Sequence, residues 1–436
     1  MTPTEAVVDW LADESQIPVL GVITLAPWGD SRCDLAARVS SLSSIEQVQQ
    51  RVRRTLRSTA GPRGDVHLTI GIGVIGAGRM GARHVHTVVG SLPDAAVTAI
   101  ADVDGARAHE AARSAGAASA YVDAQELISD PAVDAVLITS PAETHAELTL
   151  RSIAAGKPVF CEKPLATTAD AARRVVEAEV AAGCRLVQMG FMRRFDPGYE
   201  EIKRTLDSGR VGAPLAMHCL HRTPEVGPYT SEKHTTEALV HEIDVVRWLL
   251  GEEIVRATVF TPRRTRHAAP EVSDPQVVLL HSEGGVLIDV DVFVNAQYGY
   301  DVRCEVVCEE ATVALASPAL VTLRHAGLES VAVPKDFRAR FSVAYRRELE
   351  AWVRTLQADL APEPSAWDGY AAATVTDASI DSLHDTAPGQ VRLDAPPPLY
   401  AAATGHAADA YPALSRRVLS ACKEDARGKG ARGRMR

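Results

Sequence analysis

The stretch Ile72-Gly73-Val74-Ile75-Gly76-Ala77-Gly78-Arg79-Met80-Gly81 decides the fold of this chain. It begins as a short apolar strand and runs into glycines at the spacing G-x-G-x-x-G, and the residues from Arg79 to Leu92 are typical of a helix. Glycine at the first position allows a tight turn, at the second it lets a pyrophosphate approach the backbone, and at the third it lets helix and strand pack closely. The stretch predicts a dinucleotide-binding unit with phosphates at the helix N-terminus.

An acidic residue supports this interpretation. The apolar run Ala96–Ala101 predicts a second strand, and it ends at Asp102. A carboxylate about twenty positions beyond the glycines accepts the adenosine ribose hydroxyls in such folds. Asp102 would repel a 2′-phosphate, so NAD is the favoured cofactor, although Arg79 in the glycine loop offers a phosphate partner and leaves NADP open.

Strands and helices alternate over residues 68–191, which predicts an α/β domain with a doubly wound parallel (Rossmann) sheet. Ligands bind beyond the carboxyl ends of such strands. Two groups of polar residues fall at those ends: Thr139 and Ser140 follow one predicted strand, and Glu162 and Lys163 follow the next. Lys163 is either a surface charge or, beside the nicotinamide, a donor that stabilises a developing alkoxide. Pro164 after it suggests a cis peptide bond.

Residues 192–400 have a different pattern, with successive strands and fewer helices. This predicts an α+β domain on a largely antiparallel, open sheet, which would bind the substrate. Residues 1–67 form an extension of unknown role, for which an appended helical piece, a disordered segment and an over-long start site all stay open. Residues 401–436 are Ala-rich and then basic, and we expect a disordered, solvated tail rather than a nucleic-acid contact.

Composition narrows the class of protein. The 436 residues are 46% hydrophobic and 23% charged, with a formal net charge of −10, which argues against a nucleic-acid surface over the body of the chain. No apolar run is long enough to span a bilayer. Seven cysteines form no C-x-x-C pair and no Cys/His cluster with metal spacing, so we expect reduced thiols, no metal and a cytoplasmic protein.

A second group of chemical interest is Glu237 and His241, four residues apart on a predicted helix that continues to Leu250. At this spacing both side chains lie on one helix face. A neutral imidazole accepts a hydroxyl proton near neutral pH, and a carboxylate beside it can orient the ring. The alternative is an exposed Glu–His pair of little consequence. These residues taken alone do not decide between the two interpretations.

Several motifs occur in one order along the chain, and together they resemble the glucose–fructose oxidoreductase/inositol dehydrogenase/rhizopine catabolism (Gfo/Idh/MocA) family. They are the glycine stretch, Cys161-Glu162-Lys163-Pro164, Gly190-Phe191-Met192-Arg193-Arg194-Phe195-Asp196, Leu239-Val240-His241-Glu242-Ile243-Asp244, Tyr298-Gly299-Tyr300-Asp301 and Ala366-Trp367-Asp368-Gly369-Tyr370. The resemblance covers roughly residues 68–399, and the Gly-Phe-Met-Arg-Arg and His-Glu-Ile-Asp stretches are similar to its inositol-oxidising branch.

The resemblance implies an NAD-dependent enzyme that oxidises the axial hydroxyl of myo-inositol to a 2-keto-inositol, without a metal and as a homotetramer. It implies catalytic roles for Lys163, His241 and Glu237, although the family usually has aspartate at position 237. The implied cofactor-binding residues are Gly76, Ala77, Gly78, Arg79, Met80, Gly81, Asp102, Thr139, Ser140, His145, Glu162 and Lys163. The implied substrate-binding residues are Lys163, Arg193, His221, Thr223, Glu237, His241, Asp244, Tyr298 and Tyr300.

Two alternatives stay open. One keeps the fold and changes the substrate to another inositol isomer or an aldose, because Thr223 stands where the inositol enzymes often have asparagine. The other is a non-catalytic sugar or nucleotide sensor of the same family. Lys163 and His241 together argue against the sensor.

Overall fold

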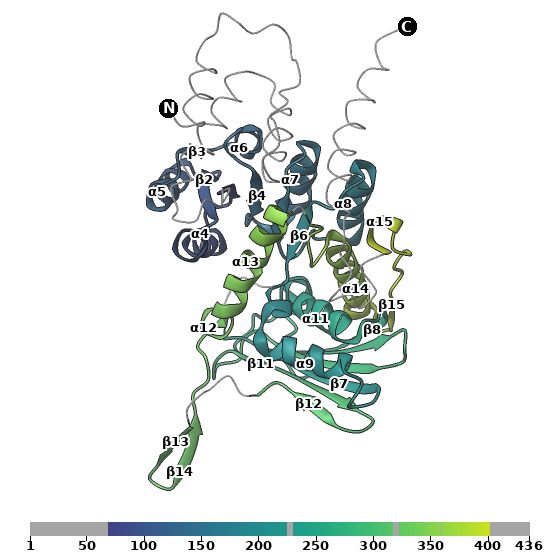
Figure 1. The fold of residues 1–436 in the computed structure, drawn as a ribbon. Coiled ribbons are helices and arrows are strands. Elements are labelled where there is room, and N and C mark those ends of the chain that lie inside the picture. The colour runs from purple at the N-terminus through teal and green to yellow at the C-terminus, as the bar shows by residue number, and fades with distance from the viewer. Residues whose placement is uncertain (1–68, 225–229, 317–321, 359, 402–436) are drawn as a thin grey trace, which may run out of the picture. The chain divides into compact units, whose positions relative to one another are not determined.

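The computed structural model describes residues 69–224, 230–316, 322–358 and 360–401 (Figure 1). Internal contacts divide the chain after Thr69, and the unit that begins at Ile70 is described here by itself. The predictions for residues 1–67 and for the tail at 402–436 lie outside the described residues. Among the helices of the described ranges, none is both long and apolar enough to cross a membrane.

The first part of this unit is a parallel sheet in the order β3-β2-β1-β4-β5-β6. Every neighbouring pair in it is parallel, and helices connect the strands. This confirms the predicted Rossmann architecture, and the burial of β1 and β4 at every position explains their continuous apolar sequence. The elements are β1 (Ile70–Ile75), α4 (Arg79–Ser91), β2 (Ala95–Ala101), α5 (Gly105–Ala115), β3 (Ser119–Tyr121), α6 (Ala124–Ser129), β4 (Ala135–Ile138), α7 (Ala142–Ala154), β5 (Val159–Glu162), α8 (Ala169–Ala182) and β6 (Val187–Gly190).

The second part is built on a sheet in the order β12-β11-β7-β10-β9-β8-β15. All its strand pairs are antiparallel except β7 with β10, as the α+β pattern predicts. Its elements as far as the last long strand are η2 (Met192–Phe195), α9 (Pro197–Asp207), β7 (Pro214–Arg222), α10 (Ser231–Lys233), η3 (His234–Leu239), α11 (Val240–Leu250), β8 (Ile254–Phe260), β9 (Gln276–Ser282), β10 (Leu287–Phe293) and β11 (Asp301–Cys308).

The remaining elements include a hairpin that extends away from both sheets in Figure 1, in which every residue of its two strands is exposed. They are β12 (Thr312–Ala314), the hairpin strands β13 (Thr322–His325) and β14 (Leu328–Val331), α12 (Phe337–Arg340), α13 (Ser342–Ala358), α14 (Ala366–Asp385), β15 (Gly389–Gln390) and α15 (Pro398–Ala401).

Helix α13 links the two parts. Its residues Leu349, Trp352 and Val353 are buried in the same apolar cluster as Ile72 of β1, and Trp352 packs edge-on against Phe160 with ring centroids 5.5 Å apart. A segment that sequence assigned to the 192–400 domain therefore completes the core of the nucleotide-binding part. Helix α13 covers apolar residues of the first sheet that would otherwise be exposed to water.

One local feature departs from expectation. His234–Leu239 is a π-helix, preceded by α10, so the helix predicted to open at Glu237 begins earlier and changes its winding before His241. Among the cysteines of the described ranges, Cys161, Cys219, Cys304 and Cys308 are buried free thiols.

Candidate active site

The glycine loop has the geometry that a dinucleotide requires. Gly76 has φ +94°, and a Cβ there would lie 2.6 Å from the backbone nitrogen of Ser140. A Cβ on Gly81 would lie 1.9 Å from the carbonyl oxygen of Gly76, so helix and loop pack too closely for any side chain. A Cβ on Gly78 would meet no atom within 4 Å. The backbone at Gly78 is therefore open to a ligand, and the loop fits the pyrophosphate predicted for it.

Asp102 lies at the end of β2 beside this loop. Its Oδ2 accepts a hydrogen bond from the backbone N–H of Ala77 at 2.8 Å, and the Arg107 guanidinium also bonds to it. The hydrogen bond from Arg107 is the main cause that lowers the pKa of Asp102 to about 2, so the carboxylate is ionised at neutral pH. Met80 packs against the core, and the Arg79 guanidinium lies 5.7 Å from the centroid of the Phe337 ring.

The loop after β4 is tied to the glycine loop and to the turn at Lys163. The Thr139 hydroxyl donates to the carbonyl oxygen of Gly76 at 2.7 Å. His145 is buried, with Nδ1 2.7 Å from the carbonyl oxygen of Pro164 and Nε2 2.8 Å from that of Ser140. Carbonyl oxygens only accept, so both ring nitrogens are satisfied together only when both carry protons. The ring therefore joins the two loops as an imidazolium.

Glu162 and Lys163 occupy the carboxyl end of β5, and the Lys163–Pro164 peptide bond is cis, as expected. Glu162 is buried, and its Oε1 lies 2.6 Å from Nε2 of His84. Burial opposes the charged carboxylate, but His84 and the Lys163 ammonium lower its pKa. Nζ of Lys163 donates to the backbone carbonyl oxygen of Glu237 at 2.9 Å, which carries the lysine across to the second part of the unit.

His241 follows in the first turn of α11, and only 7% of it is exposed. Its pKa is well below the usual value, first because burial disfavours the charged ring and then because Lys163, Arg193 and His221 add positive charge nearby. The imidazole is therefore neutral near pH 7 and able to accept a proton. Nζ of Lys163 thus bonds to the carbonyl oxygen of the residue four positions before His241, and its positive charge lowers the pKa of the His241 ring, although 78 positions separate the two residues in sequence (241 − 163).

A buried polar cluster surrounds His241 on the second sheet. The His221 ring lies 6.1 Å from the His241 ring, and Tyr300 lies 6.2 Å from His221 on the other side. Arg193 and Glu242 form an ion pair that is only 1% exposed at each side chain, and Glu242 Oε2 lies 2.9 Å from His221 Nδ1. Burial is the main reason that the pKa of Tyr300 rises to about 12, so its hydroxyl keeps its proton.

Three further residues were predicted to bind the substrate, and their surroundings differ from one another. Thr223 is buried and follows His221 by two residues in extended chain, so the two side chains lie on the same face. The Asp244 carboxylate is buried and receives hydrogen bonds from Arg194, and its predicted place in a polyol pocket stays a prediction. Tyr298 is 50% exposed and bonds through its hydroxyl to Asp301 at 2.9 Å, with Arg222 beside it. It therefore lies outside the cluster, since its partner Arg222 points to the face opposite His221.

In this structure the Glu237 carboxylate does not bond to Nδ1 of His241, and its predicted role in the reaction stays a prediction. Nδ1 of His241 has no hydrogen-bond partner, and the Glu237 carboxylate lies 3.9 Å from Nζ of Lys233. The reason is the π-helix, in which hydrogen bonds run to the fifth residue and the four-residue spacing no longer places side chains on one face. Glu237 contributes its backbone carbonyl, the acceptor for Lys163.

Sequence reasoning missed two residues that support this site. Glu242 neutralises Arg193 and holds His221, and His84 on α4 bonds to Glu162. Both are polar or charged residues at buried positions of their helices, which local sequence did not distinguish from their polar neighbours. Their partners lie 49 and 78 residues away, so local spacing did not connect them.

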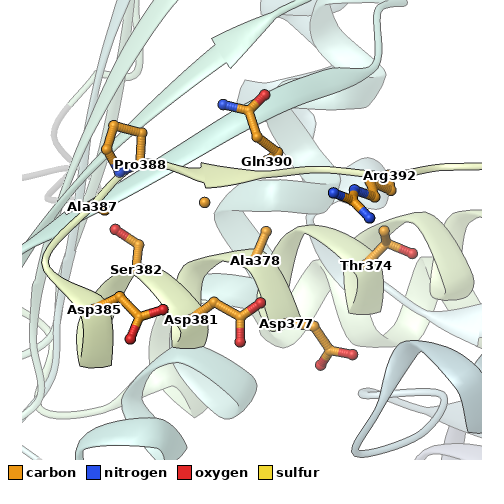
Figure 2. Close-up of a pocket in the computed structure, with 11 residues that line it drawn as sticks. Thr374, Asp377, Ala378, Asp381, Ser382, Asp385, Ala387, Pro388, Gln390 and Arg392 are labelled. Carbon is orange, nitrogen blue, oxygen red and sulfur yellow. The ribbon is translucent and has the colours of Figure 1, made fainter.

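Figure 2 shows a groove that lies apart from these residues, between α14 and the segment that carries Gln390 and Arg392. Its volume is about 520 Å³, and its walls include Asp377, Asp381 and Asp385. None of its lining residues belongs to the predicted site. In the described ranges, no group of three or more His, Cys, Asp or Glu residues is arranged to hold a metal ion.

The open glycine loop, the ionised Asp102, the half-buried Lys163 and the buried His241 are the features of an NAD-binding oxidoreductase of the two-domain type. Residues 70–191 match the family described as "Oxidoreductase family, NAD-binding Rossmann fold", and residues 199–314 match the "GFO/IDH/MocA C-terminal domain". The chain belongs to the GFO/IDH/MocA oxidoreductase family, as the sequence motifs predicted.

Similar proteins agree with this assignment. The chain is 47% identical to an inositol 2-dehydrogenase of Ralstonia nicotianae over 335 residues, covering 76% of this chain and 99% of the relative. It is 49% identical to inositol 2-dehydrogenase 1 of Saccharopolyspora erythraea with the same coverage. The fold matches the crystal structure of myo-inositol dehydrogenase from Lactobacillus casei in complex with NAD(H) and myo-inositol, with a TM-score of 0.74, 35% identity and coverage of 76% and 100%.

Proposed function

We propose that this protein oxidises myo-inositol to 2-keto-myo-inositol (scyllo-inosose) with NAD. The observation that carries the proposal is the hydrogen bond that ties the Lys163 ammonium to the turn just before the buried, neutral imidazole of His241. The relatives named inositol 2-dehydrogenase, at 47–49% identity, supply the substrate class. Bound NAD would accept the hydride from the carbinol carbon.

The protein's own residues would accept the proton, stabilise the developing charge and bind the other hydroxyls. His241 takes the hydroxyl proton, because its lowered pKa keeps it unprotonated before the reaction. Lys163 donates a hydrogen bond to the same oxygen and stabilises the negative charge that develops there. His221 lies beside His241 and Tyr300 lies beside His221, and both would offer hydrogen bonds to further hydroxyls. A polyol presents only hydroxyls, so a site of this kind discriminates against analogues that leave its buried polar groups unpaired.

The cofactor would be held by the glycine loop, which leaves Gly78 accessible, and by the Asp102 carboxylate. Thr139, Ser140 and His145 would fix the loop that borders the nicotinamide. Because the Glu237 carboxylate does not touch His241, we assign the proton transfer to His241 and Lys163 alone.

The deciding experiment compares kcat/KM for myo-, scyllo- and chiro-inositol and for glucose, each with NAD and with NADP. We expect the highest value for myo-inositol with NAD. A higher value for another isomer or for glucose would keep the fold and reassign the substrate. Ligand binding without turnover of any member of the panel would instead support the sensor alternative.

We also propose a cytoplasmic homotetramer that associates through the open face of the second sheet, an arrangement taken from the family resemblance. Light scattering coupled to size-exclusion chromatography measures the assembly. A mass of one or two chains would contradict the tetramer.

A further inference from the structure

The carboxylate of Asp102 has no acceptor position left over. Its oxygens receive hydrogen bonds from the backbone N–H groups of Ala77 at 2.8 Å and Asp104 at 2.9 Å. They also accept hydrogen bonds from Nε of Arg107 at 3.0 Å and from Nη2 of Arg107 at 2.7 Å. A carboxylate offers about four acceptor sites. The ribose hydroxyls of NAD can therefore bind Asp102 only if one of these donors leaves.

Arg107 is the donor that is free to leave. The Ala77 and Asp104 donors belong to the glycine loop and to the residue before α5, whose backbone positions are set by the fold. The side chain of Arg107 is long and 48% exposed, and it reaches Asp102 from the first turn of α5. Rotation about its side-chain bonds would move it away without moving the backbone.

We propose that Arg107 is a specificity-determining residue of the cofactor site, which yields to the ribose hydroxyls of NAD and becomes the partner of a 2′-phosphate once the Asp102 charge is removed. A guanidinium binds a phosphate with two parallel hydrogen bonds, as it binds the carboxylate here. In the natural protein Asp102 excludes the 2′-phosphate twice, since it repels the phosphate and also occupies the arginine that would bind it. The inference rests on the adenosine ribose lying at Asp102.

Arg79 is the competing candidate, because it lies in the glycine loop. Its guanidinium lies over the ring of Phe337 on α12, 5.7 Å from the centroid. Arg107 already contacts the very carboxylate that the ribose would contact. The structure therefore favours Arg107 over Arg79 as the phosphate partner.

The test measures the affinity of the full-length protein for adenosine 2′,5′-bisphosphate and for AMP by calorimetry. The variants are Asp102→Ser alone and combined with Arg107→Ala, Arg79→Ala or Arg113→Ala. Arg113 lies on the same helix, is 76% exposed and pairs with Glu110, so it is the matched control for removal of a positive charge. Because neither ligand is an inositol, failure of the substrate assignment would leave this result unaffected. Asp102→Asn, which keeps one acceptor oxygen for the loop, replaces Asp102→Ser if the latter does not fold.

We expect Asp102→Ser to bind the bisphosphate at least about tenfold more tightly than the natural protein does. The gain should disappear in Asp102→Ser/Arg107→Ala and persist in the Arg113 double variant. Persistence of the gain without Arg107, or its loss only without Arg79, would overturn the proposal. So would the absence of any gain in both Asp102→Ser and Asp102→Asn.

Discussion

The Nζ atom of Lys163 donates a hydrogen bond to the backbone carbonyl oxygen of Glu237, 2.9 Å away across 74 residues of sequence. The carbonyl belongs to the π-helix that leads directly into α11, four residues before His241. The bond therefore sets the lysine of the nucleotide-binding part against the turn that carries the proposed base. A backbone acceptor holds the ammonium whatever the side chain at 237, which explains how glutamate is compatible with this arrangement.

Replacement of either proposed catalytic residue should abolish most of the activity. We expect Lys163→Ala and His241→Ala each to lower kcat for myo-inositol by about 10²–10⁴-fold, because each removes proton transfer or charge stabilisation in the transition state. The double variant should be little worse than the worse single variant, since the two residues act as one unit. His218→Ala, an exposed histidine on β7 paired with Asp289, is the control and should keep its activity. Undiminished turnover in either single variant would remove the catalytic assignment.

The pH dependence of kcat/KM should report His241. Burial and the nearby positive charges hold its pKa well below 6.5, so the rate should stay level as the pH falls through 6.5 and should decline only at lower pH. Lys163→Met removes one of those charges, so the pKa of His241 should rise and the acid limb should move to higher pH. A profile measured on both proteins at high enzyme concentration decides this. An acid limb at 6.5 or above in the natural protein would contradict it.

His145 should make the protein less stable in alkali. Its pKa is raised from 6.5 to about 9, because the neighbouring Cys161 and the two carbonyl acceptors outweigh the burial that opposes the charge. A raised folded-state pKa contributes stability that is fully present below pH 6.5 and is lost as the pH rises through about 9. The contribution is of the order of 3 kcal/mol by this shift. Thermal unfolding of the natural protein and of His145→Gln should therefore differ most at pH 6 to 7 and converge near pH 10. A difference that stays constant over this range would show that the ring is neutral.

Glu242 should contribute strongly to the stability of the protein, because it neutralises the buried guanidinium of Arg193. Glu242→Gln leaves the guanidinium of Arg193 buried without a countercharge, and breaking such a pair from one side costs about 3–5 kcal/mol. Denaturant unfolding measures the loss. Glu201→Gln breaks an ion pair with Arg204 in which both side chains are about two-thirds exposed, so it should leave the stability unchanged. Equal effects of the two substitutions would mean that burial does not set the strength of these pairs.

Local sequence predicted the features that depend on backbone conformation and strand order. The spacing of Gly76, Gly78 and Gly81 predicted the loop because only glycine meets its steric demands. Lys163 was placed correctly at the carboxyl edge of β5, because a strand buried on both faces ends at its first charged residues. The family motifs then extended the prediction to the second part of the chain.

The partners of charged side chains could not be predicted in this way. Asp244 pairs with Arg194 and Tyr298 bonds to Asp301, and local sequence indicated neither partner. Each choice depends on which long-range neighbour folding brings within hydrogen-bond distance. The π-helix before His241 has a similar cause, since its winding is not set by intrinsic helix preference.

From its residues alone, the chain specifies a nucleotide-binding fold and a dinucleotide loop, because glycine spacing and apolar periodicity act over a few neighbouring positions. The roles of Lys163 and His241 were implied by the resemblance of its motifs to a family. Only the tertiary structure determines the partner of each charged side chain. Lys163 bonds to the turn before His241, Arg193 pairs with Glu242, and Arg107 pairs with Asp102. Buried charges require partners, and those partners come from whichever segments the core places beside them.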